Sequence, residues 1–378
     1  MRAVDQVIEA LRDRGGAASS WLVGEPCFDP PVELRDALAR ASRADTFCYS
    51  PPAGLPRLRE ILADRHGEAG CRTAPDEVVI TNGAKGGLLA VLASLLEPGD
   101  ELIHPLPCYP AYPAMTKRLG GLPVPVAEGN GTFDGWLEAV SDALGPRTRA
   151  VVLSSPSNPT GATLTEDQAR TLVELCRDHD VRLLCDEAYI DFRYHGGAGR
   201  LPAHFDPERT TVIQVRSASK SWALCGWRLG WVVADSAFAA RVAAQHAALL
   251  NPASGPAQEA FAMLPLVGAD YLSRARAAVR SRIADLGAAL AERFEIVHQP
   301  AGGFYLWLDV GANIGADSTA ALCSTVARRH GVGLWPGEDF GGAGHVRLAV
   351  TAPPAAEWEA AVGALVSALS STSAHDGV

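Results

Sequence analysis

The chain has 378 residues, of which 48% are hydrophobic and 20% charged, and its formal net charge is -10 at pH 7. This length predicts two domains rather than one small core. The acidic balance argues against a nucleic-acid partner, which would need clustered basic residues. No apolar run approaches the length of a membrane span, so we expect no membrane association.

The cysteines and histidines indicate the compartment and the metal content. Eight cysteines are scattered without a CxxC pair, and together with ten histidines they form no metal-ligand spacing. We therefore expect reduced cysteines, a cytoplasmic location and no bound metal. Residues 1–16 interleave charges with apolar positions at helical spacing, which predicts a surface helix and not a secretory signal.

Short β-branched runs alternate with helical stretches through the middle of the chain. One helix is predicted after Gly83, and another after the capping-box pattern Thr165–Gln168. The alternation predicts an α/β fold with a mostly parallel seven-stranded sheet and helices on both faces. The predicted strands are Glu77–Thr81, Glu101–His104, Leu122–Val126, Ala150–Ser154, Arg182–Cys185, Thr211–Val215 and Leu229–Ala234.

The carboxy-terminal part has a different pattern, with long helices and few strands. This pattern predicts a smaller α+β domain built on an antiparallel sheet. Its predicted helices are Tyr271–Arg293, Thr319–His330 and Ala355–Leu369, and its predicted strands are Phe294–His298, Gly303–Asp309 and Gly344–Val350.

Ligands of parallel α/β sheets bind outside the carboxyl ends of the strands, so the residues after each strand are informative. Lys220 follows one strand, and Arg228 lies eight positions later among glycines. A lone lysine there is usually a solvated charge. A lysine with a nearby arginine suits a carbonyl cofactor that carries a phosphate, because the amine can form an imine and the guanidinium can bind phosphate through two hydrogen bonds.

Acidic, phenolic and amide side chains follow two further strands. Asp186 could cap the next helix, or it could pair with a protonated pyridine nitrogen, as pyridoxal 5′-phosphate (PLP) chemistry requires. Tyr189 could then donate a hydrogen bond to the 3-oxygen of the ring. Asn158 lies in a Pro/Ser/Gly cluster that is most often a simple turn, but its amide could reach the same oxygen.

Two weaker signals point to the same cofactor. The small residues of Asn82–Gly87 open a helix, where free N–H groups favour phosphate. Tyr109 follows another strand. An aromatic residue there is more often part of the core, but in this company it is placed to stack on a ring.

Together these segments resemble the class I/II aminotransferases of PLP fold type I, which are aspartate aminotransferase-like. The resemblance covers nearly the whole chain, in the order of the family. The matching segments are Gly24–Pro26, Tyr49–Arg59, Thr81–Lys85, Pro107–Tyr112, Asn158–Gly161, Asp186–Tyr189, Ser217–Lys220, Gly226–Gly230, Gly333–Gly341 and Arg347. It implies a large PLP-binding domain at residues 36–265, with residues 1–35 and 266–378 forming the small domain.

The resemblance implies transamination between an amino acid and a 2-oxo acid through an internal aldimine of PLP with Lys220, whose amine would also move the α-proton. Asp186 would hold the pyridine proton, Asn158 and Tyr189 would bond the 3-oxygen, and Tyr109 would stack on the ring. The residues implied for the phosphate are the backbone of Gly83, Ala84 and Lys85 and the side chains of Ser217, Ser219 and Arg228.

The resemblance also implies an obligate homodimer with shared active sites, in which Tyr49 reaches the phosphate of the other subunit. Arg347 would clamp the substrate α-carboxylate, with Gly24 and Asn158 closing over it. Lys85 stands where many relatives have a small hydroxyl residue, which leaves the side-chain contact to phosphate open. Arg347 is followed by Leu348 and Ala349. Many relatives have Ser or Thr at the second of these two positions, and we expect this difference to have little consequence.

Other functions remain open at this point. A PLP-dependent lyase, decarboxylase, oxidase or cyclase would use the same Lys–Asp–Arg set. A regulator with an aminotransferase-like domain would need a DNA-binding segment, for which we expect no room before Gly24. Gln245–Pro256 contains no Arg or Lys, so an acidic substrate is not favoured by that route, although other loops could supply a cation. We expect the side-chain pocket to be lined by loops near Ala17–Leu22, near Tyr49 of the partner subunit and near Asn251. Trp21 could narrow this pocket, but we favour a hydrophobic plug of the amino-terminal segment.

Overall fold

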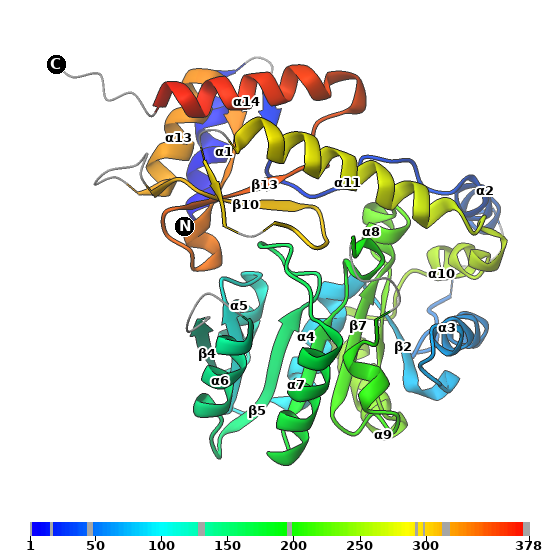
Figure 1. Cartoon of the computed structure of the whole chain (residues 1–378). Coiled ribbons are helices and arrows are strands. Elements are labelled where there is room, and N and C mark those ends of the chain that lie inside the picture. The colour runs from blue at the N-terminus through cyan, green and yellow to red at the C-terminus, as the bar shows by residue number, and fades with distance from the viewer. Residues whose placement is uncertain are drawn as a thin grey trace.

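The computed structural model describes residues 2–15, 18–43, 48–127, 133–194, 199–291, 294–297, 299–311 and 318–372. Two main sheets, each with its own helices, lie one above the other (Figure 1). The larger sheet has seven strands, as the sequence predicts, and the smaller one has four. No helix in the described part of the chain is both long and apolar enough to cross a membrane.

The large sheet is almost entirely parallel. Its strand order is β2 (Val78–Thr81), β8 (Gly230–Val233), β7 (Val212–Ser217), β6 (Arg182–Asp186), β5 (Thr148–Ser154), β3 (Glu101–Leu106) and β4 (Leu122–Ala127). Strand β8 runs antiparallel to both of its neighbours, β2 and β7. All four residues of β2 and of β8 are buried, as expected for strands covered on both faces.

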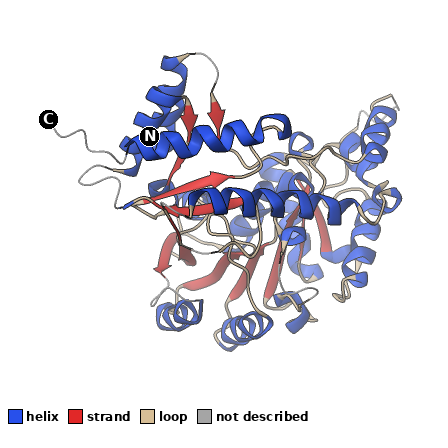
Figure 2. Ribbon diagram, turned by 45° about the horizontal axis from the view of Figure 1, so that its top comes forward, coloured by secondary structure: helices blue, strands red, loops and turns tan. Residues whose placement is uncertain are grey.

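Helices cover both faces of this sheet (Figure 2). Helices α4 (Gly83–Leu95) and α9 (Ser236–Leu250) pack on one face, and α6 (Phe133–Ala143) and α7 (Glu166–Asp178) pack on the other. Helix α7 begins with the predicted capping box, in which Thr165 and Gln168 each accept a backbone N–H of the other. The remaining helices of this half are α2 (Val32–Ala41), α3 (Pro56–Glu68), α5 (Ala111–Arg118), α8 (Ala218–Ser221) and α10 (Gly255–Phe261).

The small sheet is antiparallel, as predicted. Its order is β12 (Trp335–Pro336), β13 (His345–Ala349), β10 (Tyr305–Asp309) and β9 (Glu295–Ile296). Its helices are α1 (Ala3–Arg14), α11 (Tyr271–Leu290), α13 (Thr319–His330) and α14 (Trp358–Thr372). Helix α1 packs against α13, so both ends of the chain join the small sheet (Figure 1).

A short parallel pair, β1 (Ser19–Ser20) with β11 (Val332–Gly333), ties the amino-terminal segment to the small sheet. One core includes residues of α1, α11, α13 and α14, while three further clusters surround the large sheet. Leu34 of α2 packs in a cluster of the large sheet. The domain boundaries at residues 35/36 and 265/266 stay a prediction.

Element ends differ from the sequence prediction by a few residues. The predicted strand Leu229–Ala234 begins only at Gly230, because Arg228 adopts a left-handed conformation with φ of 52°. The predicted strand Phe294–His298 is reduced to β9, and His298 lies outside the described residues. Helix α11 ends at Leu290, and residues 292–293 of its predicted range also lie outside them.

Candidate active site

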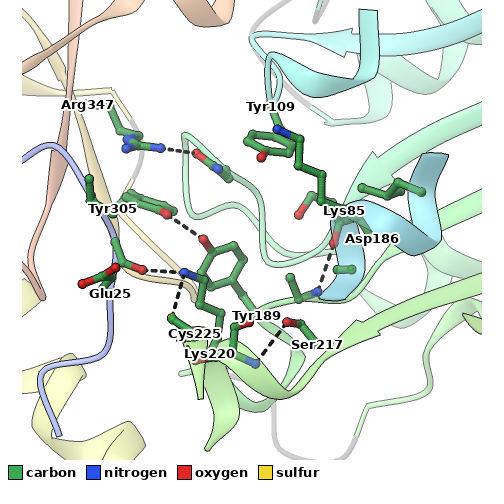
Figure 3. Close-up of a pocket in the computed structure, with 18 of the residues that line it drawn as sticks. Glu25, Lys85, Tyr109, Asp186, Tyr189, Ser217, Lys220, Cys225, Tyr305 and Arg347 are labelled. Atoms are coloured by element: carbon green, nitrogen blue, oxygen red, sulfur yellow. Dashed lines mark hydrogen bonds between the residues drawn. The ribbon is translucent and has the colours of Figure 1, made fainter. Parts of the chain in front are cut away.

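A cleft of about 440 Å³ lies at the carboxyl ends of the large-sheet strands, where the small sheet faces them (Figure 3). Apart from Gly83 and Tyr49, every site residue predicted from the sequence lines it. These lining residues are Gly24, Ala84, Lys85, Tyr109, Asn158, Asp186, Tyr189, Ser217, Ser219, Lys220, Arg228 and Arg347. Segments from both sheets and from the amino-terminal stretch therefore meet at one place.

Lys220 lies in α8, the short helix that follows β7 directly. Ser217 begins this helix as its cap, because its hydroxyl oxygen accepts the N–H of Ser219 at 3.1 Å. The Lys220 amine donates a hydrogen bond to the carbonyl oxygen of Gly24 at 2.7 Å and lies 3.9 Å from the sulfur of Cys225. The amine thus projects across the cleft toward the amino-terminal segment (Figure 3).

Asp186 is the last residue of β6, and its carboxylate is buried at the floor of the cleft. Oδ1 accepts the N–H of Ala188 at 3.1 Å, and Oδ2 accepts the hydroxyl of Tyr112 at 2.8 Å. Burial raises the pKa of Asp186 to about 6, although both hydrogen bonds act to lower it. No ion pair within the described part of the chain involves Asp186, so this carboxylate is available to a cation from outside the protein.

Tyr189 and Tyr109 place two phenol rings at the cleft. The Tyr189 hydroxyl lies 2.5 Å from the hydroxyl of Tyr305, and burial raises the pKa of Tyr189 well above its usual value. The ring of Tyr109 meets that of Tyr112 edge-on, with centroids 5.6 Å apart and an interplanar angle of 84°. Tyr109 therefore has an aromatic support on one side and faces the cleft (Figure 3).

Gly83 lies behind the cleft wall, at the first turn of α4. Its φ of +71° favours glycine, and a Cβ there would lie 2.7 Å from Nη2 of Arg228. The Arg228 guanidinium donates to the carbonyl oxygen of Cys225 at 2.9 Å, which fixes it beside the start of α4. Free N–H groups of a helix start next to an arginine suit an anion such as phosphate.

Arg347 lies on β13 and is buried, with 3% of its surface exposed. Its guanidinium donates to Oδ1 of Asn158 at 3.0 Å and to the carbonyl oxygen of Leu22. Burial lowers its pKa, and its Nε has no hydrogen-bond partner. Among the described residues no carboxylate forms an ion pair with Arg347, so a substrate carboxylate could bind there.

Two predicted residues lie elsewhere. Tyr49 does not line the cleft of its own chain, and 84% of its surface is exposed. Trp21 is fully buried, with its ring centroid 5.6 Å from that of Trp358, which agrees with its predicted role as a plug. The cleft also holds residues that the sequence analysis did not single out, namely Val23, Glu25, Leu88, Ser154, Ala188, Cys225, Gly226, Tyr305 and Trp335.

Comparisons with known proteins agree with this geometry. The profile of the family described as "Aminotransferase class I and II" matches residues 20–365. The probable aspartate/prephenate aminotransferase of Thermus aquaticus is 34% identical over 89% of this chain and 88% of its own length. The arginine–pyruvate transaminase of Pseudomonas aeruginosa is 34% identical over 86% of this chain and 84% of its own.

Solved structures show the same fold. A single mutant of the Thermus thermophilus aspartate aminotransferase superposes with a TM-score of 0.89 at 30% sequence identity, covering 97% of both chains. The chain therefore has the fold that its resemblance to PLP fold type I predicted. The chain belongs to the class I and II aminotransferase family.

Proposed function

We propose that this aminotransferase carries PLP on Lys220 and uses it to exchange an amino group between an amino acid and a 2-oxo acid. The observation that carries the proposal is the arrangement of the cleft. The Lys220 amine on α8, the Asp186 carboxylate at the end of β6 and the Tyr109 ring between β3 and α5 face one space of about 440 Å³.

The residues present fit the cofactor. Asp186 is a buried carboxylate whose pKa is raised to about 6, and a cationic ring nitrogen would supply the counter-charge that the described residues do not. Ser217, Ser219 and Arg228 line the end of the cleft near the start of α4, where a phosphate would be held. Tyr109 would stack on the ring, with Asn158 and Tyr189 beside its 3-oxygen.

When bound, PLP supplies an electron sink for charge that develops at the substrate α-carbon. Lys220 would remove and return the proton at that carbon, since its amine lies in the cleft, where it reaches the carbonyl oxygen of Gly24. Arg347 would orient the substrate through its α-carboxylate, and Gly24 and Asn158 would close over it. The small sheet, which supplies Arg347, would help to exclude water from the cleft.

An acidic amino acid such as aspartate is the substrate we propose first. Named relatives act on aspartate, and Lys85 supplies a cation at the cleft that has no ion-pair partner within the described part of the chain. A basic amino acid is the second candidate, because Glu25 lines the same cleft and one relative is named as an arginine–pyruvate transaminase. The side chains of the two candidate substrates carry opposite charges, so substitutions of Lys85 and Glu25 can distinguish them.

We also propose that the enzyme is a homodimer with shared active sites. The exposed phenol of Tyr49 would then reach the phosphate in the partner's cleft. A cytoplasmic location is proposed as well, since all eight cysteines are free and most of them are buried. Sedimentation of the protein with PLP bound would test the dimer, and a monomer with full activity would contradict it.

The decisive experiment is an absorbance scan of the protein reconstituted with PLP against a panel of amino acids. A visible band that is lost on adding aspartate, and slowly or not at all on adding arginine, supports the acidic substrate. Lys85→Gln should then weaken the response to aspartate, while Glu25→Gln should weaken a response to arginine. Ammonia released without a 2-oxo acid acceptor would indicate a lyase or oxidase instead. A normal half-reaction in Lys220→Ala, or no band in the wild type, would overturn the proposal.

A further inference from the structure

Tyr305 lies on β10 of the small sheet and lines the cleft, with only 3% of its surface exposed. The sequence pattern assigns it no role beyond a strand position. In the structure its side chain touches three groups of the site at once. It lies beside Tyr189 and Arg347 (Figure 3) and against Gly24.

The first contact is between two hydroxyl groups. The phenol oxygens of Tyr305 and Tyr189 lie 2.5 Å apart, and their rings meet edge-on with centroids 5.5 Å apart. Each hydroxyl has one proton to donate. If Tyr189 donates its proton to the cofactor 3-oxygen, Tyr305 must donate to Tyr189. A hydroxyl that accepts a hydrogen bond becomes a stronger donor, so Tyr305 would strengthen the bond from Tyr189 to the cofactor.

The second contact is between the ring of Tyr305 and the Arg347 guanidinium, whose central carbon lies 4.2 Å from the ring centroid. Trp335 and Phe340 add two more rings, at 4.4 and 4.8 Å. An aromatic face attracts a cation, and the attraction is larger where water is excluded, as it is around buried Arg347. The ring therefore helps to hold the guanidinium in its position above the cleft.

The third contact explains why residue 24 is a glycine. A Cβ at Gly24 would lie 2.4 Å from the Tyr305 hydroxyl oxygen, so the amino-terminal segment can approach Tyr305 only because residue 24 has no side chain. The carbonyl oxygen of Gly24 accepts the Lys220 amine. Tyr305 thus lies against the segment that meets the reactive lysine.

We propose that Tyr305 is a positioning residue with two separable functions. Its hydroxyl sets how strongly Tyr189 hydrogen-bonds the cofactor oxygen, and its ring holds Arg347 toward the substrate carboxylate. This inference rests on the function proposed above, because it takes PLP as the cofactor and Arg347 as the carboxylate site.

The two functions are separated by two substitutions. Tyr305→Phe removes the hydroxyl and keeps the ring, while Tyr305→Leu removes both. Tyr194→Phe is a matched control, because the partly buried Tyr194 hydroxyl donates to the carbonyl oxygen of Gly303, close to Tyr305 in the chain, without lining the cleft. Each protein is reconstituted with PLP, and the pH midpoint of its visible absorbance band is measured alongside KM and kcat.

The hydrogen bond from Tyr305 to Tyr189 predicts the direction in which the pH midpoint of the band moves. A weaker donor from Tyr189 leaves more negative charge on the cofactor 3-oxygen to hold the proton of the nitrogen linked to Lys220. Tyr305→Phe should therefore raise the pH midpoint by about half a unit and leave KM within about twofold. Tyr305→Leu should raise the midpoint similarly and also raise KM for the amino acid that removes the band by about tenfold. Tyr194→Phe should do neither.

Two outcomes would decide against the inference. If Tyr305→Phe leaves the pH midpoint where Tyr194→Phe leaves it, the hydroxyl function is wrong. If Tyr305→Leu folds and keeps the wild-type KM, the ring function is wrong. Should Tyr305→Leu fail to fold in thermal melting, Tyr305→Met, which fills more of the space, replaces it. A wild-type protein with no visible band in PLP would instead refute the proposed function itself.

Discussion

The hydroxyl of Tyr112 donates a hydrogen bond of 2.8 Å to Oδ2 of Asp186, and both side chains are buried beneath the cleft. Tyr112 lies in α5 and Asp186 ends β6, so the contact joins two elements that are 74 residues apart. A hydrogen bond donated to a carboxylate stabilises its ionised form. Tyr112 therefore favours the charged state of Asp186 that a protonated ring nitrogen requires.

Tyr112→Phe should impair the enzyme without unfolding it. Without the hydroxyl the pKa of Asp186 rises further, because burial is no longer offset by this hydrogen bond. We expect kcat/KM to fall about ten- to hundredfold, the usual worth of a hydrogen bond to a charged group, and the acid limb of its pH profile to move to higher pH. Thr116→Val is the control, since the Thr116 hydroxyl donates only to the backbone oxygen of Tyr112. An unshifted profile in Tyr112→Phe would contradict this role.

Asp186→Asn should stabilise the protein without its cofactor while it destroys activity. The pKa of Asp186 is raised in the folded state to about 6, so folding is favoured by its protonated form. That contribution is present below the unfolded value of 3.8 and is lost as the pH rises through about 6. At pH 8 a neutral Asn avoids the buried charge, which should add about 1–3 kcal/mol to the free energy of unfolding.

Urea unfolding at pH 8 and pH 4 measures this effect of Asp186→Asn. The difference between variant and wild type should appear at pH 8 and shrink at pH 4. Adding PLP should reverse the order, because only the carboxylate can pair with a cationic ring nitrogen. Equal stabilisation by Asn at both pH values would show that the charge of Asp186 is not the cause.

Asp339 connects the start of α1 with the substrate site. Its carboxylate accepts the N–H groups of Ala3 and Val4, at 2.8 and 3.0 Å, and the indole N–H of Trp335 at 2.9 Å. The ring of Trp335 lies 4.4 Å from the Arg347 guanidinium. One carboxylate therefore caps a helix and fixes the ring that packs on Arg347.

Asp339→Asn should lower both stability and substrate affinity. We expect a loss of about 1–2 kcal/mol in the free energy of unfolding from the helix cap. KM for the amino acid should rise about threefold as Trp335 loosens over Arg347. Asp5→Asn is the control, because Asp5 caps the same helix by accepting the N–H of Arg2 but does not touch Trp335. If both variants change KM alike, the effect comes from the helix and not from Trp335.

The sequence predicts the cofactor side of the cleft better than the substrate side, for a physical reason. Asp186 ends a strand of the large sheet, Lys220 and Tyr109 follow two others, and parallel strands bring their carboxyl ends to one edge. The local sequence pattern is therefore enough to predict that these three residues lie together. Arg347 was identified only through the resemblance to a family. Its strand belongs to the small sheet, and no local sequence pattern indicates that its side chain faces the cleft.

Tyr305, Trp335 and Tyr112 were not identified because their roles arise from tertiary contacts. The run Tyr305–Asp309 reads as a buried strand, and its alternation does not say which face meets the cleft. Trp335 reaches Arg347 because β12 and β13 pair with these two residues opposite each other, which one sequence does not reveal. A hydroxyl-bearing aromatic residue at the start of the apolar run Tyr305–Leu308 was the one available signal for Tyr305. The two-residue strands β1 and β11 are likewise too short for periodicity to detect.

His66 should make the stability of the fold depend on pH below neutrality. It is buried beside Trp231, whose indole N–H donates to its Nε2 at 3.0 Å, and its Nδ1 has no partner. Burial and nearby arginines hold the pKa of His66 well below 6.5, so the neutral ring contributes stability that is present above 6.5 and is lost as the pH falls through the lower folded value.

His66→Gln keeps an acceptor for Trp231 but does not titrate. Between pH 6.5 and 5 the free energy of unfolding should therefore fall less steeply in this variant, by up to about 1.4 kcal/mol per pH unit, the equivalent of one proton. Urea unfolding at half-unit pH steps provides the measurement. His179→Gln is the matched control, since His179 is exposed at the end of α7. If the free energy of unfolding of His66→Gln falls with pH as steeply as that of the wild type, His66 is not the group that takes up the proton on unfolding.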